Sequence, residues 1–356
     1  MRPAKLVLED GAVFFGELAA DGADMAGEVV FNTALTGYQE VMTDPSYAGQ
    51  MVVLTYPLIG SYGTAAAWAE SSGPAARVLI VHRLEAPSHA RSEHPLALYC
   101  RTRGVGLLTG VDTRALTRHL RTGGTRRGAV VSVTERDGAA LELARRVSLA
   151  GIVDTVSTPA AYAVGQRGPH LALIDYGLKT SIIDALRARG ARLTVLPART
   201  SVSELAALAP DGVVLSNGPG DPEDLADRLD VIRWAIAERP TLGICLGHQL
   251  VALALGGRTY ALKFGHHGSN HPVLDYRTGA IQITAQNHGY AVDADRLPPH
   301  LQVRFVNLHD GTVEGLAHTE RPLLTVQHHP EAAPGPREAA YVFDEFLDWV
   351  KGDTGA

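Results

Sequence analysis

Strand and helix patterns alternate from residue 171 to residue 255, and this alternation restricts the possible fold more than any other feature of the chain. Short apolar runs typical of buried strands occupy residues 171–175, 192–196, 212–215 and 240–244. Patterns typical of helices occupy residues 179–189, 203–208, 224–238 and 248–255. Such alternation predicts a largely parallel sheet with helices on both faces.

The first half of the chain has a different pattern. Two strand-like runs flank Asp10-Gly11, a dipeptide that favours a hairpin turn, and further β-rich runs follow at 27–31 and 51–55. Residues 151–169 then lose any regular strand or helix pattern, and their glycine and proline residues are typical of a linker. We therefore expect an α/β protein with a mixed, β-rich N-terminal domain over 1–150, the linker, and an α/β domain over 170–356.

Cys245 stands where the strand at 240–244 gives way to a helix. Gly243 and Gly247 flank it, and glycine leaves room for backbone and substrate to approach closely, as in a nucleophile elbow. A cysteine attacks a carbonyl as the thiolate, which a helix N-terminus or a cationic histidine favours. Alone, the pattern fits a buried structural cysteine equally well.

His329-Pro330-Glu331 is a candidate for the base and its orienting carboxylate. The run at 323–327 predicts a strand, so the pair would lie at a strand end, and Pro330 stiffens the segment. In a triad the acid sets the tautomer of the histidine, and the histidine takes the proton of the nucleophile. A solvated turn is the alternative. The spacing to Glu331 favours His329 over the adjacent His328 as the base.

A third motif, at 215–222, follows the strand at 212–215, where open α/β sheets place their sites. Backbone N–H groups around Gly218, together with that of Leu246, could form an oxyanion hole for acyl transfer. An ordinary Gly-Pro turn is the alternative. The motif is not a phosphate loop, because Gly-x-x-x-x-Gly-Lys-Ser/Thr occurs nowhere in the chain.

Together the three motifs resemble the class I, or triad, glutamine amidotransferases. Further segments make the chain similar to the small subunit of carbamoyl-phosphate synthetase, and they cover nearly its whole length: 31–40, 43–47, 56–60, 110–118, 264–273, 286–290 and 328–336. Departures are few. Ser61 stands where asparagine is expected, and His328 stands where phenylalanine is common.

The resemblance implies a reaction and a set of residues. Cys245 would attack the side-chain amide of glutamine, His329 would shuttle the proton, and Glu331 would orient His329; water would then release glutamate from a thioester. The resemblance also assigns substrate-binding residues, one of which would reach the site from the first domain: Ser46, Gly218, Gly220, Leu246, Gln249, Asn287, Gly289 and Tyr290.

The resemblance further implies a partner. Ammonia would pass through an internal tunnel to a large subunit, which would use ATP and Mg²⁺ to make carbamoyl phosphate from bicarbonate for arginine and pyrimidine biosynthesis. The β-rich first half would be the docking surface. This chain itself would carry no cofactor. His266, His267 and His271 have a spacing that could ligate zinc, but no carboxylate or cysteine lies within their segment and the resemblance assigns no metal there.

Composition narrows the class of protein. A net charge of −6 and a pI near 6.2 argue against a nucleic-acid surface. Two cysteines, Cys100 and Cys245, are too few for a disulfide framework and fit a reducing compartment, with Cys100 a buried bystander. The start has no signal-peptide pattern, and no run of about 18 apolar residues occurs. We expect a cytoplasmic protein with no membrane contact.

Two other functions fit parts of the sequence. The same amidotransferase chemistry could serve another synthetase, such as those for anthranilate or GMP, but these lack the N-terminal half. A regulatory subunit with a dead triad is the second alternative. The presence of Cys245, His329 and Glu331 speaks against it.

Overall fold

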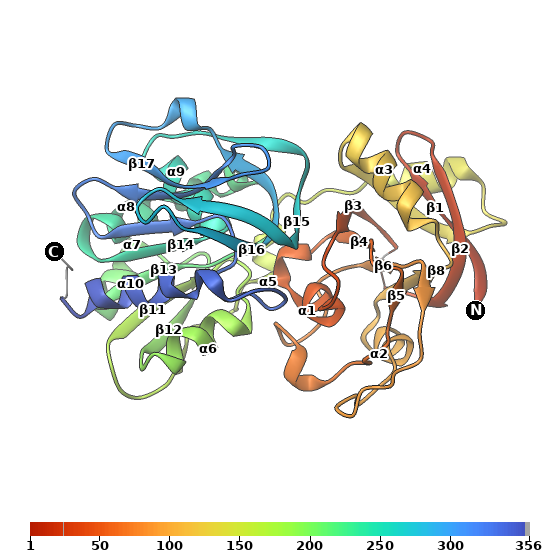
Figure 1. The fold of residues 1–356 in the computed structure, drawn as a ribbon, viewed down its shortest axis with the longest axis horizontal. Helices are drawn as coiled ribbons and strands as arrows, with labels where there is room; N and C mark the ends of the chain where they lie inside the picture. The colour runs from red at the N-terminus through yellow and green to blue at the C-terminus, as the bar shows by residue number, and fades with distance from the viewer. Residues whose placement is uncertain (24, 353–356) are drawn as a thin grey trace. The chain divides into compact units, whose positions relative to one another are not determined.

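The computed structural model describes residues 1–23 and 25–352, and the chain divides into two compact units (Figure 1). The first unit comprises Met1–Leu149 with Lys263–Gly268, and the second comprises Ala150–Leu262 with Ser269–Ala356. The segment 151–169 belongs to the second unit, where it forms the short helix α5 (Val153–Val156) and the strand β10 (Tyr162–Val164).

A closed barrel forms the first unit. Its strands follow the order β1-β2-β8-β6-β4-β3-β9: β1 (Arg2–Leu8), β2 (Val13–Ala20), β8 (Gly106–Thr109), β6 (Val78–Ile80), β4 (Gln50–Leu54), β3 (Ala26–Asn32) and β9 (Arg126–Ser132). The predicted hairpin is confirmed, since β1 and β2 are antiparallel with Val7 opposite Val13. The predicted strands at 27–31 and 51–55 correspond to β3 and β4.

Short elements surround this barrel. They are the two-stranded sheet of β5 (Leu58–Ile59) and β7 (Arg83–Leu84), and the helices α1 (Tyr38–Thr43), α2 (Leu96–Arg103), α3 (Thr113–Gly123) and α4 (Asp137–Arg145). Cys100, on α2, packs in an apolar cluster with Met42 and Leu107. Burial raises the pKa of the Cys100 thiol to about 12, so this cysteine is poorly suited to act as a nucleophile.

The second unit is built on a ten-stranded sheet. Five neighbouring strands are parallel, as the alternation predicts: β12 (Arg192–Pro197), β11 (His170–Asp175), β13 (Gly212–Leu215), β14 (Thr241–Ile244) and β19 (Leu323–Val326). β10 borders this parallel part on one side. On the other side lie four further strands: β18 (Val313–His318), β16 (Ile281–Val292), β15 (Thr259–Asp275) and β17 (Leu301–Asn307).

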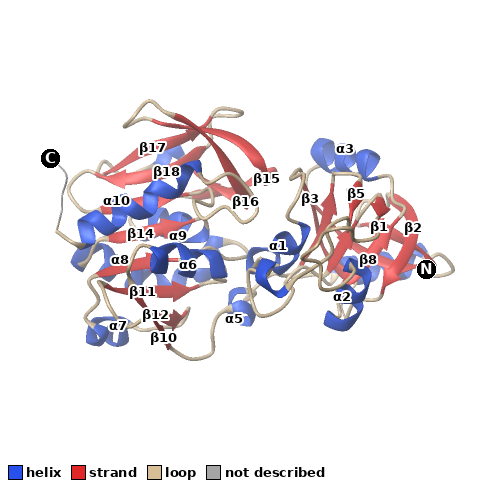
Figure 2. Cartoon of the chain, turned by 60° about the horizontal axis from the view of Figure 1, so that its bottom comes forward, coloured by secondary structure: helices blue, strands red, loops and turns tan. Residues whose placement is uncertain are grey.

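Helices cover both faces of this sheet (Figure 2). Alternate residues of β11 divide the core, because Ala172 and Ile174 pack on one side and Leu171 and Leu173 on the other. The first side is covered by α7 (Val202–Leu208), α8 (Leu229–Glu238) and α9 (Leu246–Ala254), and the second by α6 (Thr180–Ala188) and α10 (Tyr341–Val350).

The predicted helix at 224–238 is divided in the structure. A 3₁₀ helix, Pro222–Arg228, comes first and contains Leu225 at φ −106° and ψ 21°, outside helical geometry; α8 begins only at Leu229. The predicted helix at 248–255 begins earlier, at Leu246, directly after the candidate nucleophile. Among the described residues, no helix is both long enough and apolar enough to cross a membrane.

Candidate active site

Cys245 lies at the turn between β14 and α9, in a backbone conformation rare for a residue with a side chain. Its φ is 52° and its ψ is −101°, and such strain persists only where the surroundings hold it. Its N–H donates to the carbonyl of Val326 on the neighbouring strand at 2.8 Å. The residue is 2% exposed. The fold therefore fixes the thiol at the carboxyl end of the central strands.

The flanking glycines allow this turn to pack. A Cβ on Gly247 would lie 2.3 Å from the carbonyl oxygen of Leu215, and one on Gly243 would lie 2.9 Å from the backbone of Gly247. The first distance is far inside van der Waals contact with backbone. Glycine at 247 is thus what lets α9 lie directly against β13.

His329 lies just beyond β19, the parallel neighbour of β14, with Ile244 opposite Val326. Its Nδ1 is 2.6 Å from Oε1 of Glu331, and its backbone N–H donates to Ala285. Because Nδ1 is engaged with the carboxylate, Nε2 is the nitrogen available to a thiol.

The charges of His329 and Glu331 stabilise one another. Burial by itself lowers the pKa of His329, but the charge of the Glu331 carboxylate and its hydrogen bond to Nδ1 raise that pKa overall. Burial by itself raises the pKa of Glu331, but the ammonium of Lys179 and the imidazolium of His329 lower it overall. The favoured state is an ionised carboxylate beside a protonated imidazole.

Lys179 is a member of this cluster to which the sequence analysis assigns no role. Its Nζ lies 2.9 Å from Oε1 of Glu331 and donates to the carbonyl of Ala332 at 2.6 Å. One signal could have identified it. Lys179 is the N-cap of α6, where the helix dipole disfavours a cation, so a lysine there indicates a specific anionic partner.

Two glutamine side chains form a chain of hydrogen bonds that begins at Sγ of Cys245. Nε2 of Gln327 lies 3.6 Å from Sγ of Cys245, and Oε1 of Gln327 accepts from Nε2 of Gln249 at 3.0 Å. Gln249, on α9, also donates to the carbonyl of Tyr290 at 2.9 Å. Gln327 was not among the predicted site residues.

Strand β16 borders the sulfur on another side. The carbonyl of Asn287 lies 3.6 Å from Sγ of Cys245, close enough to accept from the thiol. A Cβ on Gly289 would meet nothing within 4 Å, so there is open space beside this part of the strand. The structure thus brings Asn287 and Tyr290 to Cys245 and Gln249.

The loop after β13 packs against the beginning of α9. A Cβ on Gly218 would lie 2.8 Å from Cδ2 of Leu246 and 2.3 Å from the carbonyl of Tyr176. Gly220 has φ +90°, which favours glycine. The predicted oxyanion-hole residues Gly218 and Leu246 are therefore neighbours.

Ser46, the residue predicted to reach the site from the first domain, belongs to the first unit. It lies in the 3₁₀ helix Pro45–Tyr47, where its N–H donates to the carboxylate of Asp44 at 2.9 Å. The residue is buried.

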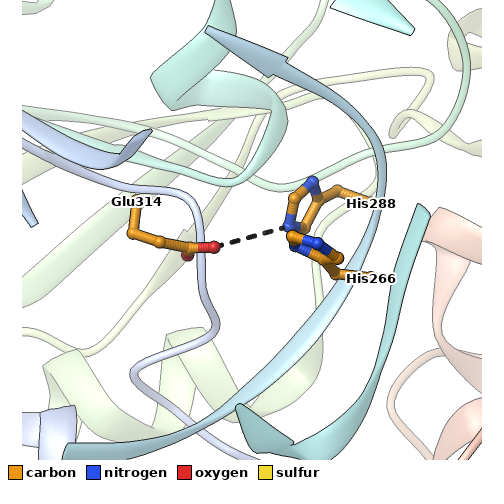
Figure 3. Close-up of side chains that lie close together, drawn as sticks. All are labelled: His266, His288 and Glu314. Atoms are coloured by element: carbon orange, nitrogen blue, oxygen red, sulfur yellow. Dashed lines mark ion pairs between the residues drawn. The ribbon is translucent and has the colours of Figure 1, made fainter. Parts of the chain in front are cut away.

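The adjacent histidines meet different carboxylates. His329 contacts Glu331, whereas Nδ1 of His328 lies 3.8 Å from Oε2 of Glu314. Figure 3 shows the imidazole of His288 facing the same carboxylate, and its Nε2 lies 4.0 Å from Oε1 of Glu314. Glu314 and His328 have no exposed surface. His328 is thus part of a second buried cluster.

The histidines considered for zinc divide between the units. His266 and His267 fall in the first unit and His271 in the second. The carbonyl of His271 accepts from Thr284, and its ring lies 5.5 Å from that of His309.

Two family models match the chain. The model described as "Carbamoyl-phosphate synthase small chain, CPSase domain" matches residues 6–130, and the model described as "Glutamine amidotransferase class-I" matches residues 172–349. Curated relatives match almost end to end. The carbamoyl phosphate synthase small chain of Symbiobacterium thermophilum is 52% identical, covering 96% of this chain and 97% of that protein. The small chain of Clostridium perfringens is 46% identical, covering 98% and 99%.

Proposed function

The chain belongs to the carbamoyl phosphate synthase small chain family, and we propose that its second unit hydrolyses glutamine through Cys245, His329 and Glu331. One observation carries the proposal. Cys245 and His329 follow the carboxyl ends of adjacent parallel strands, and the imidazole is held by a buried carboxylate 2.6 Å away. A merely structural cysteine requires neither arrangement.

The reaction follows from the charges. The thiolate of Cys245 attacks Cδ of glutamine, and the carbonyl oxygen takes up the negative charge. Protonated His329 gives its proton to the amide nitrogen, the C–N bond breaks, and ammonia leaves a thioester on Cys245. Water then attacks the thioester while His329 takes a proton from it, and glutamate leaves. Glu331 holds Nδ1 of His329 throughout.

The remaining residues bind substrate in this proposal. Backbone N–H groups of Gly218 and Leu246 stabilise the oxyanion, a contribution worth about 10²–10³ in rate for one donor. Gln249, Asn287 and Tyr290, with the glycines at 220 and 289 and Ser46, hold the glutamine.

The first unit, which matches the synthase small-chain model, is the proposed docking surface for the large chain. Ammonia passes internally to that chain, where ATP and Mg²⁺ drive synthesis of carbamoyl phosphate for arginine and pyrimidine biosynthesis. No cofactor is required on the small chain, because amide hydrolysis by a thiol needs only acid–base groups and water.

The test is alkylation by a chloroketone analogue of glutamine, followed by mass spectrometry of the intact chain and its peptides. We expect one adduct, on Cys245, and protection by glutamine. Cys100→Ser serves as the matched control and should label like the wild type. An unlabelled wild-type chain, or labelling confined to Cys100, would contradict the proposal and favour a regulatory subunit.

A further inference from the structure

We propose that Gln327 is a further catalytic residue, whose side-chain amide stabilises the Cys245 thiolate and connects it to Gln249. This inference rests on the proposed function. It adds a donor to the sulfur that the triad does not include.

The position of Gln327 is fixed. It follows β19 directly, has no exposed surface, and its backbone N–H donates to Glu314 at 2.8 Å. Its side chain spans the gap between Sγ of Cys245, 3.6 Å from Nε2, and Nε2 of Gln249, 3.0 Å from Oε1.

The orientation of the amide follows from its neighbours. Nε2 of Gln249 faces two oxygens, the carbonyl of Tyr290 at 2.9 Å and Oε1 of Gln327 at 3.0 Å. A carbonyl can only accept, so the atom of Gln249 facing Tyr290 must be the NH₂ group. Gln327 must therefore present its oxygen to Gln249 and its own NH₂ group to the sulfur.

Two contacts on the sulfur distinguish its protonation states. The carbonyl of Asn287, 3.6 Å away, can accept from a thiol but gives a thiolate nothing. The NH₂ group of Gln327 can donate to a thiolate. Since Cys245 is 2% exposed, water cannot fully replace that donor, and an anion with one donor fewer is less stable at a buried position. The contact with Gln327 therefore favours the thiolate.

The same chain of amides reaches toward the substrate. Gln249 gives both amide hydrogens to Tyr290 and Gln327, which leaves its Oε1 as an acceptor for a donor on the substrate. The hydrogen bonds would then all run in one direction. A substrate N–H would donate to Gln249, Gln249 to Gln327, and Gln327 to the sulfur. Aligned bonds polarise and strengthen one another. Glutamine bound at Gln249 would thereby strengthen the donor on the nucleophile.

The test compares Gln327→Met, which keeps the shape but removes the donor, with Gln327→Glu, which keeps the acceptor for Gln249 but turns an oxygen toward the sulfur. Gln282→Met is the matched control, because Gln282 is a buried glutamine of the same unit whose amide donates to Tyr341 instead. The rate of Cys245 carboxamidomethylation by iodoacetamide is measured against pH by mass spectrometry of its peptide. His329, Glu331 and Lys179, the titratable groups around the sulfur, are common to all variants.

We expect the pH of half-maximal alkylation to rise by about one to two units in Gln327→Met and further in Gln327→Glu, and to stay unchanged in Gln282→Met. In the assembled complex, kcat for glutamine should fall at least about tenfold in Gln327→Met. Folding is checked by circular dichroism; if the methionine variant does not fold, the isosteric glutamate variant decides alone. Wild-type pH profiles in the folded variants would overturn the inference. If wild-type Cys245 failed to react with the glutamine analogue, the proposed function itself would fall instead.

Discussion

The ammonium group of Lys179 lies 2.9 Å from Oε1 of Glu331, the same oxygen that Nδ1 of His329 approaches at 2.6 Å. The Lys179 side chain is 3% exposed and that of Glu331 is fully buried. One carboxylate oxygen thus faces two cationic groups, which keeps it ionised and leaves the imidazole only one way to orient.

Replacing Lys179 by methionine should lower the free energy of unfolding at pH 7 by about 3–5 kcal/mol, because Glu331 is left as a buried charge with one partner fewer. Urea unfolding followed by tryptophan fluorescence measures the loss. Lys351→Met is the control: this lysine is exposed, so its removal should change stability by no more than about 0.5 kcal/mol. Equal effects of the two substitutions would contradict the buried pair.

The cost of Lys179→Met should depend on pH with a definite sign. The folded-state pKa of Glu331 is lowered from 4.5, so its contribution to stability is complete above pH 4.5 and is lost as pH falls through the lowered value. The difference in unfolding free energy between wild type and variant should therefore be largest near neutrality and shrink below about pH 4.5. Urea titrations from pH 3.5 to 8 test this; a difference that grows in acid would refute it.

The adjacent histidines should have unequal effects on turnover. His329→Asn removes the proposed acid and base and should lower glutamine turnover by about 10²–10⁴. His328→Phe should change turnover little, because His328 faces Glu314 rather than the thiol. Steady-state glutaminase assays of both variants in the complex make the comparison, and the reverse ranking would mean that the triad is placed incorrectly.

Cys245→Ser should separate glutamine hydrolysis from the ATP-dependent synthesis of carbamoyl phosphate. Glutamine-dependent formation of carbamoyl phosphate should disappear in the reconstituted complex, while synthesis from added ammonium should stay near the wild-type rate, because the proposed ATP-dependent steps occur on the large chain. Assembly of the complex is checked by size-exclusion chromatography. A parallel fall of both activities in an assembled complex would argue against this division of labour.

Gly247→Ala should be destabilising by about 2–3 kcal/mol, because the new Cβ would lie 2.3 Å from the Leu215 carbonyl and force α9 away from β13. The midpoint of thermal unfolding and the glutaminase activity should both decrease. Gly138→Ala is the contrasting control, since it lies within helix α4 and its Cβ would meet nothing within 4 Å. That substitution should stabilise its helix by up to about 1 kcal/mol.

The sequence predicts the parallel part of the second unit well, because its strands are short apolar runs. Four of them, β11, β13, β14 and β19, are buried on both faces. Strands β15 and β16 gave no such signal. β15 carries His266, His267 and Asn270 within a single strand, and buried and part-exposed positions follow no period of two along it. Its residues also divide between the two units, which no local pattern can express.

Residues of the site differ in the same way. Cys245 and His329 can be identified in the sequence because their side chains are reactive and because glycine or proline stands next to them. Lys179 and Gln327 have no such local pattern, and only the fold shows which residues they contact. The role inferred for Gln327 depends on Cys245 and Gln249, which stand far from it in sequence and reach it only because β14 and β19 are neighbours.

The pairing of β14 with β19 has a consequence for a chain still being made. β14 ends at Ile244, and β19 begins at Leu323, so the sheet neighbour of β14 that leads to His329 is synthesised well after Cys245. Until β19 is made and inserted, the nascent protein has a nucleophile without its proposed base and lacks the Val326 carbonyl that holds the Cys245 N–H. Truncated products that stop before β19 would lack the proposed base, and we expect them not to hydrolyse glutamine.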